Sequence, residues 1–142
     1  MSANKRASRR IIEEIFSAGN LDLADELLHE DAVGHDPAQP EAVKGPAGLK
    51  ESAAGYRSAF PDLVINVDEI FADDDLVAVR WTATGTHKGD LFGIPATGKQ
   101  ATVTGITIDK YKDGKLAESW TNWDTLGLLQ QIGAVPAAMQ TA

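Results

Sequence analysis

Three residues near the end of the chain, Trp120, Asn122 and Asp124, alternate along one predicted strand. Alternating residues of a regular strand share a face, so together they would offer an aromatic wall, an amide donor and a carboxylate. A carboxylate beside tryptophan in an apolar pocket has its charged form destabilised, which makes it a competent base toward a carbon acid. Asp124 also precedes a predicted helix, and Asp is a preferred N-cap, so capping is the competing role.

His35 and Asp36 form a polar pair immediately before Pro37. One interpretation is an imidazole that faces a pocket and is oriented by the carboxylate. The other is a turn that begins at Asp36, with His35 held by an ordinary hydrogen bond. A metal site would need at least three convergent ligands, and His35, Asp36, His87 and Asp124 do not have metal-like spacing. We therefore expect no metal.

Further candidates lie in the middle of the chain. Arg80 falls within a predicted strand, where it either faces solvent or pairs with a carboxylate, because an unpaired buried charge is costly. Tyr56 and Trp81 would either pack in the core or line a ligand pocket. Phe92 lies in an apolar, glycine-containing loop that would pack on the core, close a pocket as a lid or contact a second subunit.

Composition and charge exclude several classes of function. The 142 residues include no cysteine, which excludes disulfides, thiolate chemistry and cysteine-ligated metal. The net charge of −8 disfavours nucleic acid as a partner. The segment 93–99 resembles a phosphate-binding loop, but Gln100 and a predicted strand follow where a Ser or Thr and a helix are required. No segment is typical of a signal peptide or a membrane span, so we expect a cytoplasmic protein with no membrane partner.

The periodicity predicts three helices followed by a sheet and one last helix. Helices are expected over 5–18, 20–28 and 46–60, and strands over 63–71, 76–87, 101–112 and 115–123. Asp113-Gly114 predicts a tight hairpin, and the segment 124–131 a final helix that ends at Gly133. A compact segment, 32–37, separates the second and third helices. We expect one domain over 1–142, with flexible ends at 1–4 and about 136–142.

Helices packed on one side of an antiparallel sheet define the α+β class, and we expect N-terminal helices on a strongly curved antiparallel or mixed sheet. Because such a sheet is strongly twisted and bent, helices that close one side leave a conical barrel with an interior pocket. The sequence therefore predicts a protein that holds a small, largely apolar molecule.

The motifs in this order resemble the SnoaL-like polyketide cyclases, which belong to the nuclear-transport-factor-2-like superfamily. The resemblance is carried by segments that cover nearly the whole chain: His35 to Pro37, Val79 to Gly89, Gly93 to Lys99, Asp113 to Lys115, Glu118 to Asp124 and Leu126 to Gly133.

This resemblance implies a conical α+β barrel and ring closure of a carbonyl-containing polyketide by intramolecular aldol condensation, without metal or organic cofactor. It implies that Asp124 removes a proton next to a carbonyl, while Asn122, Trp120, His35 or Arg80 stabilises the enolate. Family cyclases pair the aspartate with a histidine, and here His87 or His35 would have to serve. The resemblance also implies a homodimer.

Two other interpretations remain open from the sequence. The same fold supports isomerisation and epoxide hydrolysis, of which the latter needs a second polar cluster to activate water. A non-catalytic domain that binds a small molecule would instead use Asp124 as a helix cap.

Overall fold

The chain begins with two helical segments that form one continuous rod. The computed structural model describes residues 2–136, in which α1 (Ala3–Arg10) runs into the π-helical segment η1 (Ile11–Ser17). The prediction of a helix here is confirmed, but its second half is wider than an α-helix, with bonds such as Ala18 N–H to the Glu13 carbonyl. This segment buries Ile11, Ile12 and Ile15 against the sheet.

Two more helices precede the main strands, and a fourth closes the described chain. They are α2 (Leu23–Leu27), α3 (Gly45–Ala59) and α4 (Thr125–Gln131). Pro46 lies in the first turn of α3, and the helix ends before Pro61, as expected. The predicted flexible ends fall partly on residues 1 and 137–142, which lie outside the described residues, whereas Ala3 and Asn4 belong to α1.

Six strands form one sheet in the order β2-β1-β6-β5-β4-β3. The bounds are β1 (Leu28–His35), β2 (Val43–Lys44), β3 (Val64–Asp73), β4 (Leu76–Thr86), β5 (Gln100–Lys112) and β6 (Lys115–Trp123). Asp113 and Gly114 have φ values of 53° and 81°, the conformation of the tight turn that the sequence predicted between β5 and β6.

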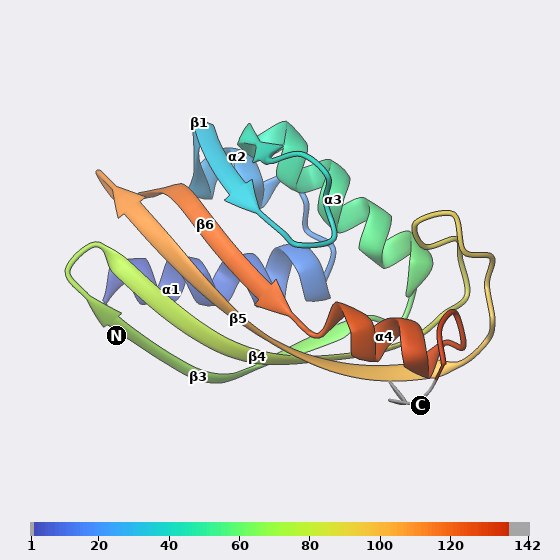
Figure 1. Cartoon of the computed structure of the whole chain (residues 1–142). Helices are drawn as coiled ribbons and strands as arrows, with labels where there is room; N and C mark the ends of the chain where they lie inside the picture. The colour runs from blue at the N-terminus through green and yellow to red at the C-terminus, as the bar shows by residue number, and fades with distance from the viewer. Residues whose placement is uncertain (1, 137–142) are drawn as a thin grey trace.

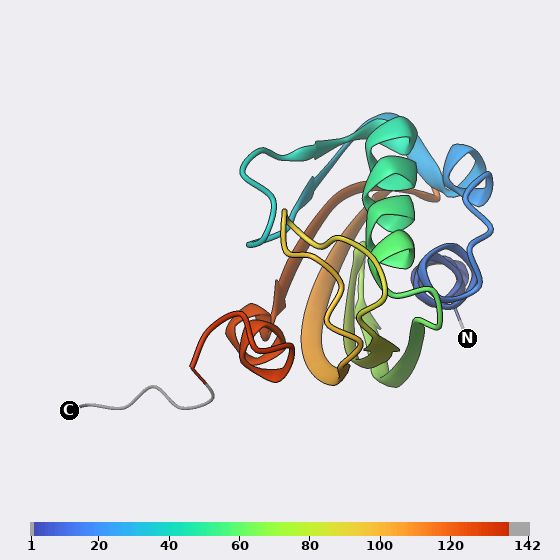
Figure 2. The ribbon, with the colours of Figure 1, turned by 90° about the vertical axis from the view of Figure 1, so that its right-hand side faces the viewer.

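One strand that shapes the site was not recognised from the sequence. Residues 32–35 of the segment expected to be merely compact belong to β1, which pairs parallel with β6 and places His35 opposite Trp120. The sheet is therefore mixed, which is one of the two arrangements that the sequence predicted. It curls around the helices without closing into a barrel (Figures 1 and 2).

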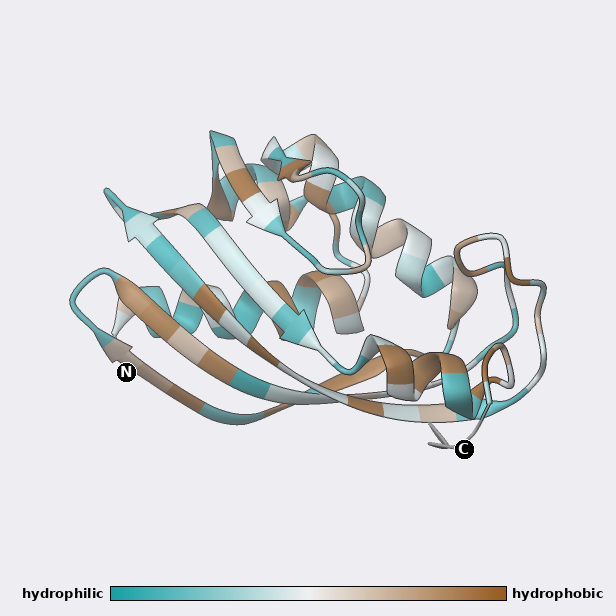
Figure 3. Ribbon diagram, viewed as in Figure 1, coloured by the Kyte–Doolittle hydropathy of each residue, from teal (hydrophilic) through white to brown (hydrophobic). Residues whose placement is uncertain are grey.

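The concave face of the sheet is covered by α1, η1 and α3 (Figure 1). Apolar and polar residues follow one another along β4 and β5, and one face of each strand packs in the core (Figure 3). The buried residues form two clusters, one under α1 and η1 and the other between α3, α4 and the sheet. Trp81 and Ile65 contact both clusters, which places them at the junction.

Candidate functional site

A row of three paired residues crosses the middle of the sheet. Gly105 of β5 lies opposite Trp81 of β4 on one side and Trp123 of β6 on the other. A side chain at position 105 would overlap the Trp81 indole, so glycine is what allows the indole to lie across the strand. The two tryptophans therefore face the same interior space.

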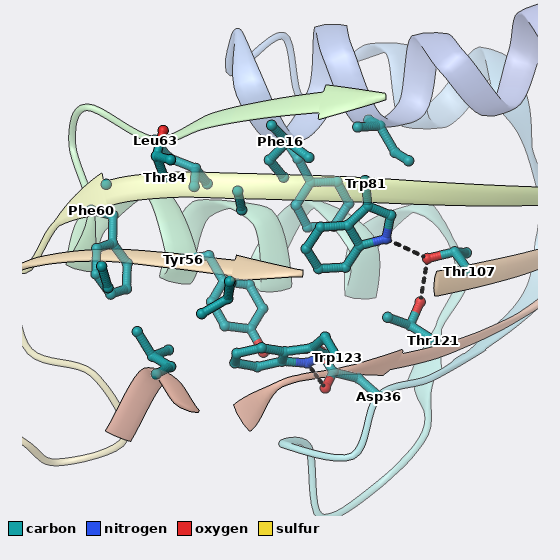
Figure 4. A pocket seen from close by; sticks show the side chains of 17 residues that line it. Phe16, Asp36, Tyr56, Phe60, Leu63, Trp81, Thr84, Thr107, Thr121 and Trp123 are labelled. Carbon is teal, nitrogen blue, oxygen red and sulfur yellow. Dashed lines mark hydrogen bonds between the residues drawn. The ribbon is translucent and has the colours of Figure 1, made fainter. Parts of the chain in front are cut away.

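This space is an apolar cavity of about 150 Å³. Trp81 and Trp123 form part of its wall, Tyr56 and Phe60 come from α3 and the residue after it, and Phe16 comes from η1 (Figure 4). A dry cavity of this size holds a group about as large as benzene. This cavity, which we call the main cavity, therefore suits one ring of a ligand that carries polar atoms at one end.

Asp36 supplies the carboxylate of the main cavity, and no other described residue that lines it carries one. Its Oδ2 accepts a hydrogen bond of 2.9 Å from the Tyr56 hydroxyl, and its Oδ1 accepts one of 2.9 Å from Trp123 Nε1. The Ala38 N–H donates to Oδ1 at 2.8 Å, as in the turn that was one of the two interpretations of this segment. Three donors from three segments fix the orientation of this carboxylate.

Two threonines extend the polar end of the cavity. Trp81 Nε1 donates to Thr107 Oγ1 at 3.0 Å, and this oxygen lies 3.0 Å from Thr121 Oγ1 (Figure 4). Both indole N–H groups are thus satisfied at the wall, which leaves the apolar ring faces toward the cavity.

A second cavity of about 110 Å³ continues toward the other end of the sheet. It shares five lining residues with the main cavity: Ile12, Phe16, Asp36, Thr107 and Thr121. Asp109 and Ser119 also line it, one row further along β5 and β6. Asp109 is 3% exposed, and burial raises the pKa of its carboxyl group.

The two tyrosines of the chain lie near these carboxyl groups, and Tyr111 is buried while Tyr56 is half-buried. Burial raises the pKa of Tyr56, and the neighbouring Asp36 carboxylate adds to the effect. Burial likewise raises the pKa of Tyr111, with a contribution from Asp109. Each hydroxyl therefore remains a hydrogen-bond donor over the physiological pH range.

The structure places Trp120, Asn122 and Asp124 away from the main cavity. Trp120 and Asn122 share a face of β6, but the β6 residues that line the main cavity are Thr121 and Trp123, on the opposite face. Trp120 and Asn122 border a depression on the outer side of the sheet. Asp124 is exposed and caps α4, because its Oδ1 accepts a 2.9 Å hydrogen bond from the Gly127 N–H.

The two candidate histidines have different surroundings. His35 has a 43% exposed side chain, its Nε2 donates to Glu118 Oε2 at 2.8 Å, and its ring stacks on Trp120. His87 is fully buried, and its Nδ1 accepts a hydrogen bond from the Thr97 N–H. The ring lies against Phe60, and its Nε2 has no hydrogen-bond partner among residues 2–136.

Of the remaining candidates, the structure brings Tyr56 and Trp81 to the main cavity. Phe92 is exposed in the loop after β4, and its ring meets the Tyr56 ring edge-on with centroids 6.1 Å apart. Arg80 lies on the outer face of the sheet, where its Nε is 2.7 Å from Glu69 Oε1 and an ion pair with Asp68 is longer. Arg80 therefore combines the two alternatives expected from the sequence: it faces solvent, and it pairs with carboxylates of the neighbouring strand.

Sequence reasoning missed Asp109 as a residue that faces a cavity. A signal was present, because every second residue of β5 faces the core, beginning with Ala101, Val103, Gly105 and Thr107. The same alternation places Asp109 on the buried face. A carboxylate at an inward position of a half-buried strand is uncommon, and it marks either a network or a site. Trp123 forms part of the cavity wall, and its Nε1 holds Asp36.

Metal ligation and membrane insertion find no support in the part of the chain that the structure describes. Within residues 2–136, no group of three or more His, Asp and Glu side chains is arranged to hold a metal ion. Across the same residues, none of the helices combines the length and apolarity that crossing a bilayer would require.

Comparison with known proteins assigns the family. The sequence model of the SnoaL-like polyketide cyclases matches residues 6–132. Aklanonic acid methyl ester cyclase DauD of Streptomyces sp. strain C5 is 28% identical over 131 residues, which cover 88% of this chain and 78% of that protein. Among solved structures, a Jannaschia sp. CCS1 protein superposes with a TM-score of 0.85 at 25% identity, covering 94% of each chain. TsrD from Streptomyces laurentii superposes with a TM-score of 0.83 at 27% identity, over 94% of this chain and 96% of that one. The chain belongs to the SnoaL-like polyketide cyclase family.

Proposed function

We propose that this protein closes a ring in an apolar polyketide by intramolecular aldol condensation, using proton transfers alone. The observation that carries the proposal is a single carboxylate, Asp36, at the polar end of an otherwise apolar cavity. Such a cavity orients a carbonyl compound against a base, which is what removal of a proton from carbon requires.

Asp36 is the proposed base, in place of the Asp124 that the family resemblance indicated. Asp124 is engaged as a helix cap, whereas Asp36 lines both cavities. The donors Tyr56 and Trp123 hold the Asp36 carboxylate in one orientation. Oδ2 accepts one of these hydrogen bonds, and a carboxylate oxygen has a second lone-pair site with which to take a proton.

The apolar walls would position the reacting part of the substrate. A volume near 150 Å³ encloses one ring, so a larger polyketide would extend from the cavity mouth. The faces of Trp81 and Trp123 border this space, and planar rings stack favourably on indoles. Holding the enolate carbon near the second carbonyl would supply much of the rate.

The test measures two reactions in the wild type and in variants of two aspartates, Asp36 and Asp124. Aklanonic acid methyl ester is the first substrate to try, because the relative DauD is named as its cyclase. Ring closure gives an isomer of equal mass, which chromatography separates. The second reaction is the opening of 5-nitrobenzisoxazole, which reports a base in a pocket without knowledge of the natural substrate.

We expect Asp36→Asn to lower both rates by about 10²- to 10⁴-fold, the usual contribution of a general base. Asp124→Asn is the matched control, since asparagine also caps helices and the residue is exposed. If both reactions were lost in Asp124→Asn but not in Asp36→Asn, the base would be Asp124 and not Asp36. Binding of the ester with neither reaction in wild type would identify a non-catalytic binding domain.

A further inference from the structure

A second carboxyl group faces the connected cavities, and the proposed base does not account for it. Asp109 lines the second cavity together with Asp36, from β5 on the sheet side. The two residues therefore reach one space from opposite ends of the polar strip formed by Thr107 and Thr121.

The surroundings of Asp109 contain hydroxyl groups rather than a cation. Ser8 Oγ donates to its Oδ2 at 2.6 Å, and Ser119 Oγ donates to its Oδ1 at 2.8 Å. Ser8 Oγ also lies 2.8 Å from the Tyr111 hydroxyl, which extends the network. No Lys, Arg or His among residues 2–136 forms an ion pair with Asp109. The two serine hydroxyls favour the charged form, but a buried carboxylate without a cation is costly, and burial outweighs the serines and raises the pKa of the Asp109 carboxyl group.

The other ionisable groups around this cavity do not reverse that preference. His35 and Asp36 line the cavity from β1 and the residue after it, and Tyr111 reaches Asp109 through Ser8. The residues that η1 and α3 contribute are uncharged: Ile11, Ile12, Phe16, Gly45, Leu49 and Ser52. An anion at Asp36 further opposes a second negative charge in the same space.

We infer that Asp109 is the proton donor of this site, where its carboxylic acid hydrogen-bonds a substrate carbonyl and protonates the alkoxide that ring closure forms. This inference rests on the proposed function and names the partner of Asp36 in that reaction. Two carboxyl groups in one space, one held by three hydrogen-bond donors and the other buried without a cation, are a recurrent arrangement for paired base and acid.

The step balances without a further reactant. Asp36 takes a proton from the carbon next to one carbonyl, and that carbon bonds to the carbon of the second carbonyl. The electron pair of the second C=O moves to its oxygen, which takes the proton of Asp109. The product is an isomer of the substrate, and a proton returned from Asp36 to Asp109 through solvent restores the enzyme.

Asp109→Asn tests the role with little change in shape, since an amide can still bond both serine hydroxyls. Asp113→Asn in the β5–β6 turn is the matched control, because asparagine tolerates its positive φ of 53°. We expect Asp109→Asn to slow ring closure by about 10²-fold and to leave 5-nitrobenzisoxazole opening unchanged, since its nitrophenolate product needs no proton donor. Unchanged ring closure, or an equal loss in both reactions, would overturn the inference.

A spectroscopic readout separates this inference from the proposed function. Acetophenone labelled with ¹³C at its carbonyl has an infrared stretch that falls in frequency when the oxygen accepts a hydrogen bond. We expect this shift on binding to the wild type and to Asp36→Asn, and its loss in Asp109→Leu, because leucine is of similar size but has no hydrogen-bond donor, whereas an amide N–H can bond a carbonyl. A shift that persists in Asp109→Leu would refute the donor role, even if wild type closes the ring. A shift that depends on Asp109 in a protein without ring closure would refute the proposed function alone.

Stability gives a third check that needs no ligand. Because the pKa of Asp109 is raised on folding, the unfolded chain loses this proton at lower pH than the native protein does. Wild-type stability relative to Asp109→Asn should therefore decrease as the pH rises from about 4, the pKa of a free aspartate. A pH-independent difference in urea unfolding would contradict a protonated Asp109.

Discussion

The indole ring of Trp81 occupies the space in which any side chain at position 105 would lie. Gly105 is thus what lets the ring cross β5 and form the wall of the main cavity. A methyl group there must displace the indole or the strand, because the overlapping atoms belong to a rigid ring packed in the core.

We expect Gly105→Ala to destabilise the protein by about 1–3 kcal/mol, the usual cost of overpacking, and to change the tryptophan emission spectrum. Urea unfolding followed by circular dichroism measures the free energy. Gly55→Ala is the matched control, since it lies within α3 with no atom near its added methyl group. It should stabilise by about 0.5–1 kcal/mol, because alanine favours helix. A neutral Gly105→Ala would mean that Trp81 does not lie across β5.

The two tyrosines provide a direct test of burial at the polar ends of the cavities. The pKa of both Tyr56 and Tyr111 is raised, mainly by burial. The folded protein should therefore show little tyrosinate absorbance at 295 nm near pH 10, where the unfolded chain in urea is half ionised. Since the unfolded state loses these protons first, the free energy of unfolding should fall as the pH rises above about 10. If a tyrosine of the native protein instead had the pKa of free tyrosine, its hydroxyl would be exposed to water and the prediction would be wrong.

Asp124 should contribute to stability through α4 rather than to catalysis. Its Oδ1 accepts the Gly127 N–H at the start of the helix. Asp124→Ala should cost about 1 kcal/mol in urea unfolding, while Asp124→Asn should cost less because asparagine also caps. Rates of benzisoxazole opening should be unchanged in both variants at temperatures where they stay folded. A stable Asp124→Ala protein that has lost this rate would restore Asp124 as the base.

The homodimer expected from the family resemblance can be tested on the outer face of the sheet. Ile106, Ile108 and Trp120 are 53%, 42% and 38% exposed there, on the adjacent strands β5 and β6. If a second copy covers this face, Ile106→Lys should yield monomers in light scattering coupled to gel filtration, because a buried lysine is costly. Ala54→Lys, on the exposed side of α3, should leave the mass unchanged. A monomeric wild type would refute the dimer.

The sequence by itself determined the elements whose signals are local. Strand periodicity placed β4, β5 and β6, Asp113-Gly114 predicted the turn between the last two, and Pro61 predicted the end of α3. Motif order indicated the family, which the comparison confirms. These features depend on neighbouring residues, so one chain segment contains the information that each requires.

Only the tertiary structure decided which residues meet. Alternation showed that Trp120 and Asn122 share one face of β6. It did not show that the helices cover the other face, which carries Thr121 and Trp123. The parallel pairing of β1 with β6 brings Asp36 beside Trp123, from 87 residues away in the sequence. Packing of α1 likewise joins Ser8 to Asp109. Period-two patterns define faces only relative to each other, and which face becomes the interior depends on long-range contacts that bury it.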